Sequence, residues 1–178
     1  MIKGIEQITL HLEDKEWPLE YIDHDRYTSR AIVYDTDGYF YFVRVSRDDD
    51  FDNVTVIETA GGGVELGEDM DTAICRDLKE ELGADVEIIC RLGTVDDYYN
   101  VIHRHNINNY YLCRAVSFGD RHLTDTEQNS FHMTTLRLTY EEAVKEYERG
   151  LCSRFGRLVG NRELPILKLA KSVLDSIK

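Results

Sequence analysis

Hydrophobic and polar residues alternate along several stretches of the chain, and this period of two is typical of half-buried β-strands. The alternation predicts strands over residues 1–11, 28–35, 39–46, 54–58, 85–95, 109–118 and 131–138. Apolar residues at helical spacing predict helices over residues 69–82, 139–149 and 162–177. Pro165 fits the first turn of the last helix. The remaining stretches are interpreted as connections: residues 13–27, 96–108, 119–131 and 153–161.

The order of these elements predicts an α+β layered sandwich, because hairpins come first, one helix follows, and further strands precede two final helices. The chain contains no repeat, linker or low-complexity tract, so residues 1–178 are predicted to form a single domain. In this interpretation residues 1–27 are an N-terminal segment, and residues 139–178 hold the C-terminal helices.

Composition indicates a folded globule and limits its partners. Of the 178 residues, 42% are hydrophobic and 10% aromatic, which argues against disorder. The net charge of −13 argues against an extended nucleic-acid interface and against binding to anionic membranes. Because no apolar run reaches transmembrane length and no leader pattern is present, the simplest compartment is the cytoplasm. The scattered cysteines are interpreted as reduced thiols: Cys75, Cys90, Cys113 and Cys152.

The most informative stretch begins with three consecutive glycines, residues 61–63, and continues into the acidic helix. A helix advances about 100° per residue, so Asp77, Glu80 and Glu81 fall on one narrow face. Carboxylates at that spacing repel one another, which an ordinary solvated acidic face, the alternative reading, does not require. A hard divalent cation removes the repulsion, and oxygen ligands suit Mg²⁺ or Mn²⁺. Arg76 lies beside the cluster and can orient one carboxylate through its planar guanidinium.

Several residues of this stretch stand at fixed intervals: Gly62, Glu68, Arg76, Asp77, Leu78, Glu80, Glu81 and Gly83. Their spacing resembles the signature box of the Nudix hydrolases, the MutT-like family, over residues 62–84. The chain departs from that box twice, because Asp77 stands where the family usually has Glu and Ala84 where a larger aliphatic residue is usual. The resemblance covers roughly residues 28–140. It implies the Nudix-type α/β/α sandwich, with a mixed β-sheet between helices.

The resemblance also implies a pyrophosphohydrolase that uses Mg²⁺ or Mn²⁺ to hydrolyse a nucleoside diphosphate linked to another group. By matching position, Glu80 and Glu81 are the expected metal ligands, together with a backbone carbonyl of Gly61 or Gly62. Asp77 matches a position that binds metal or activates water in relatives, and its side chain is one methylene shorter than the usual Glu.

Three further residues complete the expected machinery. Arg76 and Glu68 are expected to set the geometry of the carboxylates. In Nudix enzymes a loop after the box often brings a further Glu to the metals, and Glu127 matches that place. Plain solvated charge is the alternative for Glu127.

Candidates for substrate contact lie outside the box: Arg44, Arg47, Tyr98 and Arg104. One of the two arginines before the box is expected on a substrate phosphate, and local pairing with the acidic run 48–50 is the alternative. Tyr98 or Arg104 is expected on a base or a terminal phosphate, with packing or turn polarity as the alternative. The substrate is expected to be a small-molecule nucleotide diphosphate derivative, without a marker that identifies it. A homodimer formed through the apolar N-terminal segment is left open.

Two other functions compete with the hydrolase. A catalytically weak Nudix domain can act as a nucleotide-ligand sensor or binding module, and Asp77 is the sequence hint in that direction. The retained Glu80 and Glu81 argue against a sensor, which has less need of both. Isopentenyl diphosphate isomerases share the fold, but no motif around the four cysteines matches what such an enzyme needs.

Overall fold

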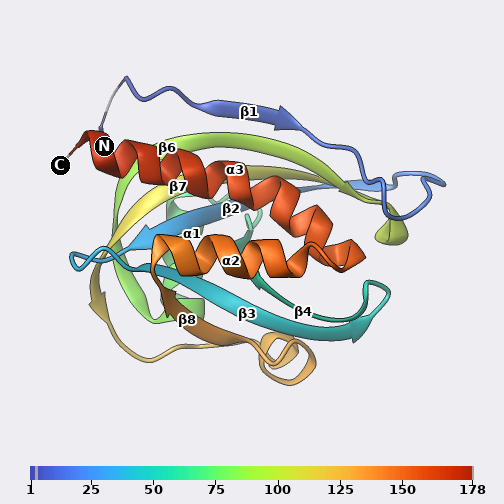
Figure 1. Ribbon diagram of the computed structural model, residues 1–178. Helices are drawn as coiled ribbons and strands as arrows, with labels where there is room; N and C mark the ends of the chain where they lie inside the picture. Colours follow the sequence, from blue (N-terminus) through green and yellow to red (C-terminus); the bar gives the residue numbers. More distant parts are fainter. Residues whose placement is uncertain (3, 178) are drawn as a thin grey trace.

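The computed structural model describes residues 1–2 and 4–177, which form one mixed β-sheet with helices on both faces (Figure 1). Lys3, inside the predicted first strand, and Lys178, the last residue of the predicted domain, lie outside the described residues. The strands are β1 (Ile8–His11), β2 (His24–Tyr34), β3 (Phe40–Asp49), β4 (Asp52–Glu58), β5 (Ala60–Gly63), β6 (Ala84–Tyr99), β7 (Arg104–Phe118) and β8 (Thr134–Leu138). The helices are α1 (Met70–Leu82), α2 (Tyr140–Gly150) and α3 (Arg154–Ser176), with short helical turns η1 (Asn100–Ile102) and η2 (Thr126–Ser130).

Strand β2 lies inside the sheet, whose strand order is β1-β6-β7-β2-β3-β4. It pairs in parallel with β7 along its whole length. Its other edge is shared, because residues 28–31 pair with β5 and residues 33–34 pair with β3. β1 also pairs in parallel, with β6 of the same chain, whereas the other strand pairs are antiparallel. The shared edge of β2 brings the glycine-rich β5 next to the middle of the sheet.

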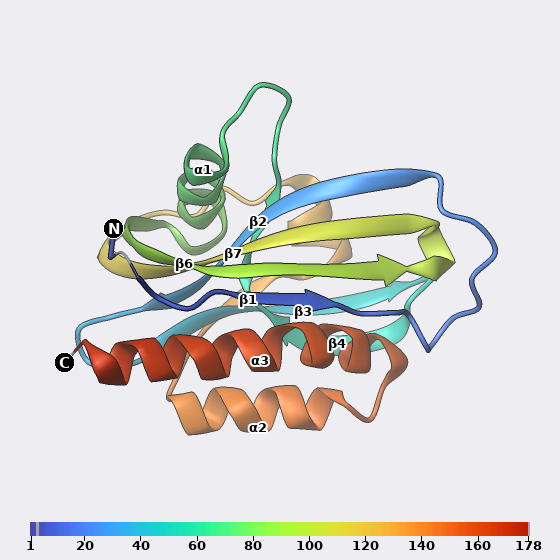
Figure 2. The ribbon, with the colours of Figure 1, turned by 90° about the horizontal axis from the view of Figure 1, so that it is seen from above.

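The sheet separates two layers of helices, with α1 on one face and α2 and α3 on the other (Figure 2). Successive side chains of β2 point to opposite faces of the sheet. Ala31 and Val33 therefore pack in the core beneath α1, and Ile32 packs in the core beneath α2 and α3. The first core includes Ile74 and Leu78 of α1. The predicted α+β class and the α/β/α sandwich with a mixed sheet are therefore confirmed.

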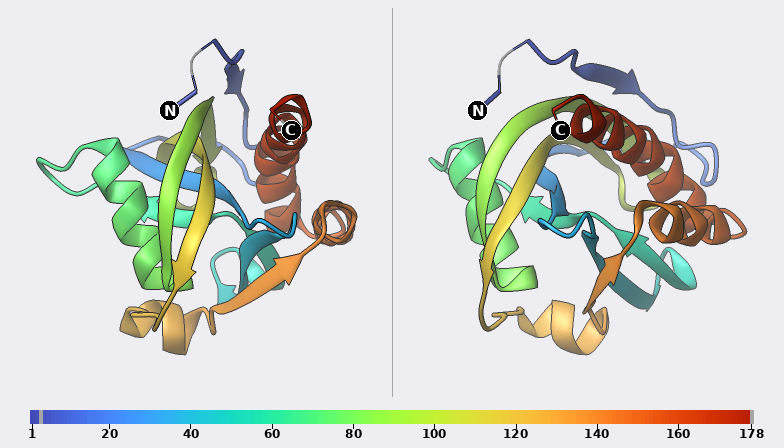
Figure 3. Two further views of the ribbon diagram at one scale, coloured as in Figure 1. Left: turned by 90° about the vertical axis from the view of Figure 1, so that its left-hand side faces the viewer. Right: turned by 60° about the vertical axis from the view of Figure 1, so that its left-hand side comes forward.

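The hairpin of β6 and β7 extends further than the sequence predicted. Residues 96–108, interpreted as a connection, supply the end of β6, the turn η1 and the start of β7. Asn106 and Asn108 each donate a hydrogen bond to Asp97 Oδ1, at 3.1 and 2.9 Å. The prediction was wrong because these paired polar groups allow a polar sequence to be buried in a sheet. Three register shifts interrupt the pairing of the two strands, which curve across the molecule (Figure 3).

Helix α3 begins at Arg154, so the loop predicted for residues 153–161 is wrong. The Ser153 hydroxyl caps the helix by accepting a hydrogen bond from the Gly156 N–H at 3.0 Å. Gly156 serves close packing rather than a loop, because a Cβ there would overlap the backbone oxygen of Gly150 at the end of α2. The sequence signal for a loop therefore came from a glycine that allows two helices to approach.

Smaller differences concern the ends of elements. Pro165 lies in the interior of α3 rather than in its first turn. Only Ile8–His11 of the predicted strand 1–11 is a strand, and the predicted loop 119–131 contains the turn η2.

Among the described helices, none combines the length and apolar character that a membrane crossing requires.

Candidate active site

The predicted acidic helix is α1, and both of its ends are fixed locally. The Asp69 side chain caps its first turn, and Gly83 ends it in the left-handed conformation with φ 68°. Asp77 and Glu81 are each only 6% exposed, whereas the Glu80 side chain is 41% exposed. Two of the three clustered carboxylates are therefore withdrawn from solvent. The helix packs its apolar residues against the sheet: Ala73, Ile74, Leu78 and Leu82.

The glycine-rich strand β5 lies directly against the two buried carboxylates. The Gly61 N–H donates a hydrogen bond to Glu81 Oε2 at 2.9 Å. At Gly61 φ is 131°, and a Cβ there would overlap the backbone oxygen of Ser29. A Cβ at Gly62 would lie 3.2 Å from Asp77 Oδ2. The hydrogen bond from Gly61 to Glu81 and the close approach of Gly62 to Asp77 bring the glycine strand and the acidic helix into one site.

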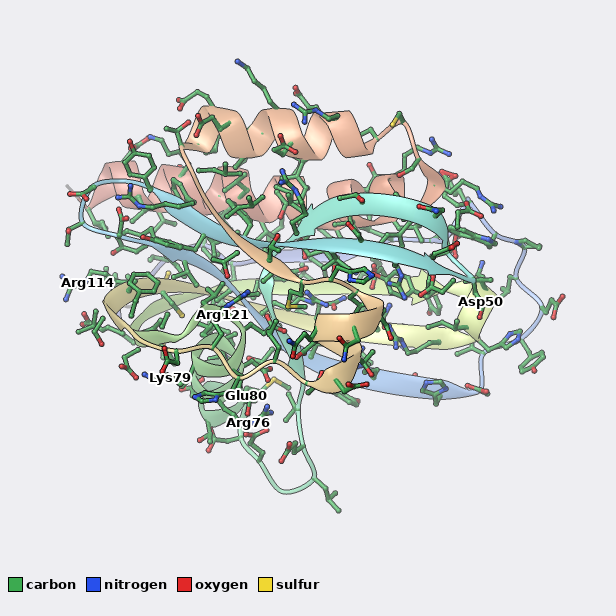
Figure 4. The ribbon with its side chains drawn as sticks, turned by 90° about the horizontal axis from the view of Figure 1, so that it is seen from below. Asp50, Arg76, Lys79, Glu80, Arg114 and Arg121 are labelled. Carbon is green, nitrogen blue, oxygen red and sulfur yellow. The ribbon has the colours of Figure 1, made fainter. Side chains whose placement is uncertain are left out.

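Arg76 ties the acidic residues together. Its guanidinium donates two hydrogen bonds to Glu68, from Nε to Oε1 at 2.8 Å and from Nη2 to Oε2 at 2.9 Å. Its Nη1 donates to Asp77 Oδ1 at 2.6 Å and lies 3.4 Å from Glu80 Oε2. Figure 4 shows Arg76 and Glu80 side by side on α1. The structure thus brings together the residues for which the sequence predicted a supporting role and the carboxylates they were expected to orient.

Burial makes the two inner carboxyl groups hard to ionise. Burial raises the pKa of Glu81 to about 8, although the Gly61 N–H and the charge of Arg30 act in the opposite direction. Burial also raises the pKa of Asp77 to about 6, against the lowering effect of the adjacent Arg76. Both groups would ionise more readily beside an additional positive charge.

The residues present fit a hard divalent cation. Asp77 Oδ2 is buried and has no hydrogen-bond partner among the described residues, which leaves one acceptor of the cluster unsatisfied. The donor set around it consists of carboxylate and backbone oxygens, the ligands that Mg²⁺ and Mn²⁺ prefer. Within residues 1–2 and 4–177, no three Asp, Glu, His or Cys side chains already converge as a ready-made cation site. Arg76 instead holds Asp77 and Glu80.

A cavity of about 460 Å³ opens beside the acidic helix. One wall is acidic and includes Asp77, Glu80 and Glu81, and the predicted Glu127 also lines the cavity. The Glu127 carboxylate accepts a hydrogen bond from the Thr124 N–H at 2.7 Å, and its charge contributes to the raised pKa of Glu81. Another part of the lining, called the basic wall, contains Arg26, Arg30, Arg104, Tyr99 and Phe155. The cavity is therefore lined by side chains of both charges.

The predicted substrate residues divide between this cavity and other surfaces. Arg47 and Arg104 line the cavity. The Arg47 guanidinium also donates hydrogen bonds to Asp49, at 2.6 Å from Nη2 to Oδ2, which is the local pairing named as its alternative. Arg44 and Tyr98 do not line the cavity. Arg44 lies 3.8 Å from Glu146 of α2, and the Tyr98 ring stacks on His105 with centroids 4.7 Å apart.

Sequence reasoning missed a buried anchor behind the glycine strand. Glu163 of α3 is 0% exposed and accepts hydrogen bonds from the Thr59 N–H at 2.8 Å and the Thr59 hydroxyl at 2.6 Å. The hydroxyls of Tyr147 and Tyr110 donate to the same carboxylate at 2.7 and 3.2 Å. Arg30 donates to the Thr59 carbonyl at 3.0 Å. Thr59 lies immediately before β5, so this network fixes the start of the strand that contacts Glu81.

A signal for this anchor exists in the sequence. Glu163 falls at helical spacing among the apolar residues Val159, Ile166 and Ala170, which places it on the buried face of the helix. Because residues 153–161 were predicted to form a loop, Val159 was not assigned to the same helix as Glu163, and the apolar stripe was not recognised. A single charged residue within an apolar helical stripe indicates a buried charge that is compensated by an ion pair or a hydrogen-bond network.

The glycine strand, the acidic helix and the charged cavity together form the candidate active site. A family model described as the NUDIX domain matches residues 24–149, which is most of the chain. The chain therefore belongs to the Nudix family and is a pyrophosphohydrolase, as the sequence predicted. Nudix hydrolases generally use divalent metal ions. Among curated proteins, no significant sequence match was found.

Solved structures show the same fold at low sequence identity. A NUDIX hydrolase from Nitrosomonas europaea is 17% identical with a TM-score of 0.58, and the similarity covers 70% of this chain and 79% of that one. A MutT NUDIX hydrolase from Burkholderia pseudomallei is 19% identical with a TM-score of 0.54, over 67% and 86%. The ORF135 protein of E. coli is 18% identical with a TM-score of 0.56, over 85% and 92%.

Proposed function

We propose that the protein hydrolyses the pyrophosphate bond of a nucleoside diphosphate linked to another group, and that it uses Mg²⁺ or Mn²⁺. Membership of the Nudix family supports the pyrophosphate bond as the point of attack. The observation that carries the metal requirement is Asp77 Oδ2, a buried and unpaired acceptor beside the glycine strand. The compartment proposed for this activity is the cytoplasm, and the partner is a small molecule rather than a nucleic acid or a membrane.

The cation would be held by Glu80, Glu81, Asp77 and a backbone carbonyl of Gly61 or Gly62. When bound, the ion supplies positive charge that polarises the phosphoryl oxygens and lowers the pKa of the attacking water. Glu81 is held in place by the Gly61 N–H at 2.9 Å, so its free carboxylate oxygen keeps a fixed position for this role. The Glu80 side chain is 41% exposed and its hydrogen bond from Arg76 is long, at 3.4 Å, so it would turn toward the cavity when the cation binds.

The hydrogen bonds of Arg76 determine which carboxylate oxygen of Asp77 is available to the cation. Arg76 is fixed by its two hydrogen bonds to Glu68 and holds Asp77 Oδ1, so that Oδ2 remains available. Asp77 is one methylene shorter than the usual Glu, so its Oδ2 would hold the cation through a water rather than directly. Glu127, in the same cavity, supplies a further carboxylate to accept a proton from the attacking water. Arg104 contacts the substrate from the basic wall.

The test is hydrolysis by wild type and Glu81→Gln of a panel of nucleoside diphosphate derivatives with Mg²⁺, measured as released phosphate or nucleotide. We expect kcat/KM to fall at least about 100-fold in the variant, because charge stabilisation by a metal is worth several kcal/mol. Glu87→Gln is the matched control, since Glu87 is exposed and pairs with Arg114 at the surface. Full activity of Glu81→Gln would refute the assignment. Binding of a nucleotide without turnover in the wild type would support the sensor instead.

A further inference from the structure

The basic wall of the cavity contains three arginines that lie outside the acidic helix and the glycine strand. Arg26 and Arg30 lie on β2 and Arg104 on β7. In the parallel pairing of these strands, residue 24 is opposite 104 and Arg26 is opposite residue 106. Residues an even number of positions apart on a strand point to the same face, so all three arginines share one face of the sheet. All three line the same cavity as the acidic helix.

Most of the N–H donors of these arginines make no hydrogen bond to the described residues, and the buried Arg30 Nε is one of them. Arg26 is half-buried and forms no hydrogen bond or ion pair with any other part of the described chain. A Cβ at Gly63 would lie 3.4 Å from Arg26 Nε, which places the guanidinium against the glycine strand. Arg104 uses Nε to donate to Asn106 Oδ1 at 2.7 Å. Arg30 differs, because it donates to the Thr59 carbonyl and lies 3.9 Å from Glu163 Oε1.

The positive charges of the three arginines also repel one another. Burial lowers the pKa of Arg104 to about 10, and the positive charges of Arg26 and Arg30 add to that effect. Burial and Arg30 likewise lower the pKa of Arg26. Glu58 and Asp77 act on the pKa of Arg26 in the opposite direction, but the Glu58 carboxylate already faces Arg162 at 3.5 Å. Cations held together in a partly dry cavity are stabilised when an anion enters.

We infer that Arg26 and Arg104, supported by Arg30, form an anion subsite for a phosphate group of the substrate that lies beyond the hydrolysed pyrophosphate. Two guanidinium groups on adjacent strands offer planar sets of donors, which match the oxygens of a phosphate dianion. The preferred substrates are diphosphate derivatives whose group beyond the scissile bond bears a further phosphate. This inference rests on the proposed function, because it assigns further residues of the same cavity to the same substrate.

The subsite is tested first without metal or turnover. Binding of inorganic phosphate is measured by calorimetry in excess chelator for wild type, Arg26→Gln and Arg104→Gln. We expect each variant to bind phosphate about 10-fold more weakly, which is the lower end for a lost hydrogen bond to a charged group. Arg114→Gln is the matched control, since Arg114 lies on the surface apart from the acidic helix (Figure 4) and pairs with Glu87. Unchanged binding in Arg26→Gln, or no binding by the wild type, would overturn the subsite.

A second measurement compares two substrates that differ only by one phosphate monoester on the group beyond the anhydride. We expect the wild type to prefer the phosphorylated compound in kcat/KM by about 10-fold or more, and Arg26→Gln to lose that preference. Arg26→Lys keeps the charge without the planar fork and is expected to retain only part of it. If Glu81→Gln abolishes hydrolysis while Arg26→Gln keeps the preference, the subsite alone is wrong. If Glu81→Gln stays active, the proposed function is wrong.

Discussion

The buried carboxylate of Glu163 gives the sharpest prediction about what holds the active site together. Its oxygens accept hydrogen bonds from the backbone and hydroxyl of Thr59 and from the hydroxyls of Tyr147 and Tyr110. Arg162 Nη2 lies 3.4 Å away and balances the charge. Substitution Glu163→Gln keeps the size of the side chain, removes the charge and places an amide donor among these donors.

The magnitude follows from burial. Glu163 is 0% exposed, and removing one partner from a buried charged network costs about 3–5 kcal/mol. The individual hydrogen bonds to a charged group would each be worth about 1.5–3 kcal/mol, but they share one carboxylate and do not add. We therefore expect a loss of about 3–5 kcal/mol in the free energy of unfolding. At about 2–4 °C per kcal/mol for a chain of this size, the melting temperature falls by roughly 6–20 °C.

The assay is urea unfolding followed by fluorescence of Trp17, the single tryptophan, which is buried in the core beside Phe51. Glu87→Gln serves as control, because its exposed pair with Arg114 is worth about 0–1 kcal/mol. If Glu163→Gln unfolds within about 0.5 kcal/mol of the wild type, as an ordinary surface substitution does, then the network does not anchor Thr59.

The same carboxylate makes stability depend on acid. Burial by itself would raise the pKa of Glu163, but Arg162, Arg30 and the hydrogen bonds from Thr59 and Tyr147 outweigh it and hold the pKa below its usual value. Its stabilising contribution is complete above the pKa of an unfolded glutamate, about 4.3, and is lost as the pH falls through the lower folded value. We expect the stability difference between wild type and Glu163→Gln to narrow below that pH.

Three further predictions concern the glycine strand and the carboxylates beside it. Gly61→Ala should lower the free energy of unfolding by at least about 2 kcal/mol, because φ is 131° there and the Cβ would overlap the backbone of β2. Gly62→Ala should stay within about 1 kcal/mol of wild type but lower kcat/KM about 10-fold, because its Cβ would lie 3.2 Å from Asp77 Oδ2. Cation binding should weaken below pH 8 and release roughly one proton at pH 7, since the pKa of Glu81 is raised to about 8 and only the ionised form is a ligand.

Each of these predictions can be refuted by a measurement of its own. Equal stability of the two glycine variants in urea would contradict the close approach at Gly61. Unchanged kcat/KM in Gly62→Ala would argue against a role for Asp77 Oδ2. Proton release is measured by Mn²⁺ calorimetry in two buffers of different ionisation enthalpy, and identical apparent enthalpies would show that Glu81 is already ionised.

The sequence predicted the sheet, the central helix and the acidic cluster because each is encoded by local spacing. Asp77, Glu80 and Glu81 are neighbours on one helix, so no tertiary information is needed to place them together. The contact of Gly61 with Glu81 follows from the family resemblance rather than from spacing. Arg104 was predicted as a substrate contact, but its grouping with Arg26 could not be predicted, because the two residues come together only through the parallel register of two strands far apart in sequence.

The errors have a common physical origin in polar residues that are satisfied by distant partners. The stretch 96–108 reads as a connection, yet Asp97 and Asn108 pair inside the sheet. Likewise, Gly156 reads as a loop residue, although it allows α3 to pack against the end of α2. Sequence patterns report the character of each residue and not the partner that compensates it, so such elements are systematically assigned to loops.

The most direct test of the central claim is a Mn²⁺ titration followed by electron paramagnetic resonance, with wild type, Glu81→Gln and the surface control Glu87→Gln. Free Mn²⁺ gives the signal, and its loss measures binding. We expect the wild type and Glu87→Gln to bind alike, and Glu81→Gln to bind at least about 10-fold more weakly, because a buried ligand fixed by Gly61 is removed. Equal binding by Glu81→Gln, or no binding by the wild type, would contradict a cation site between the glycine strand and the acidic helix.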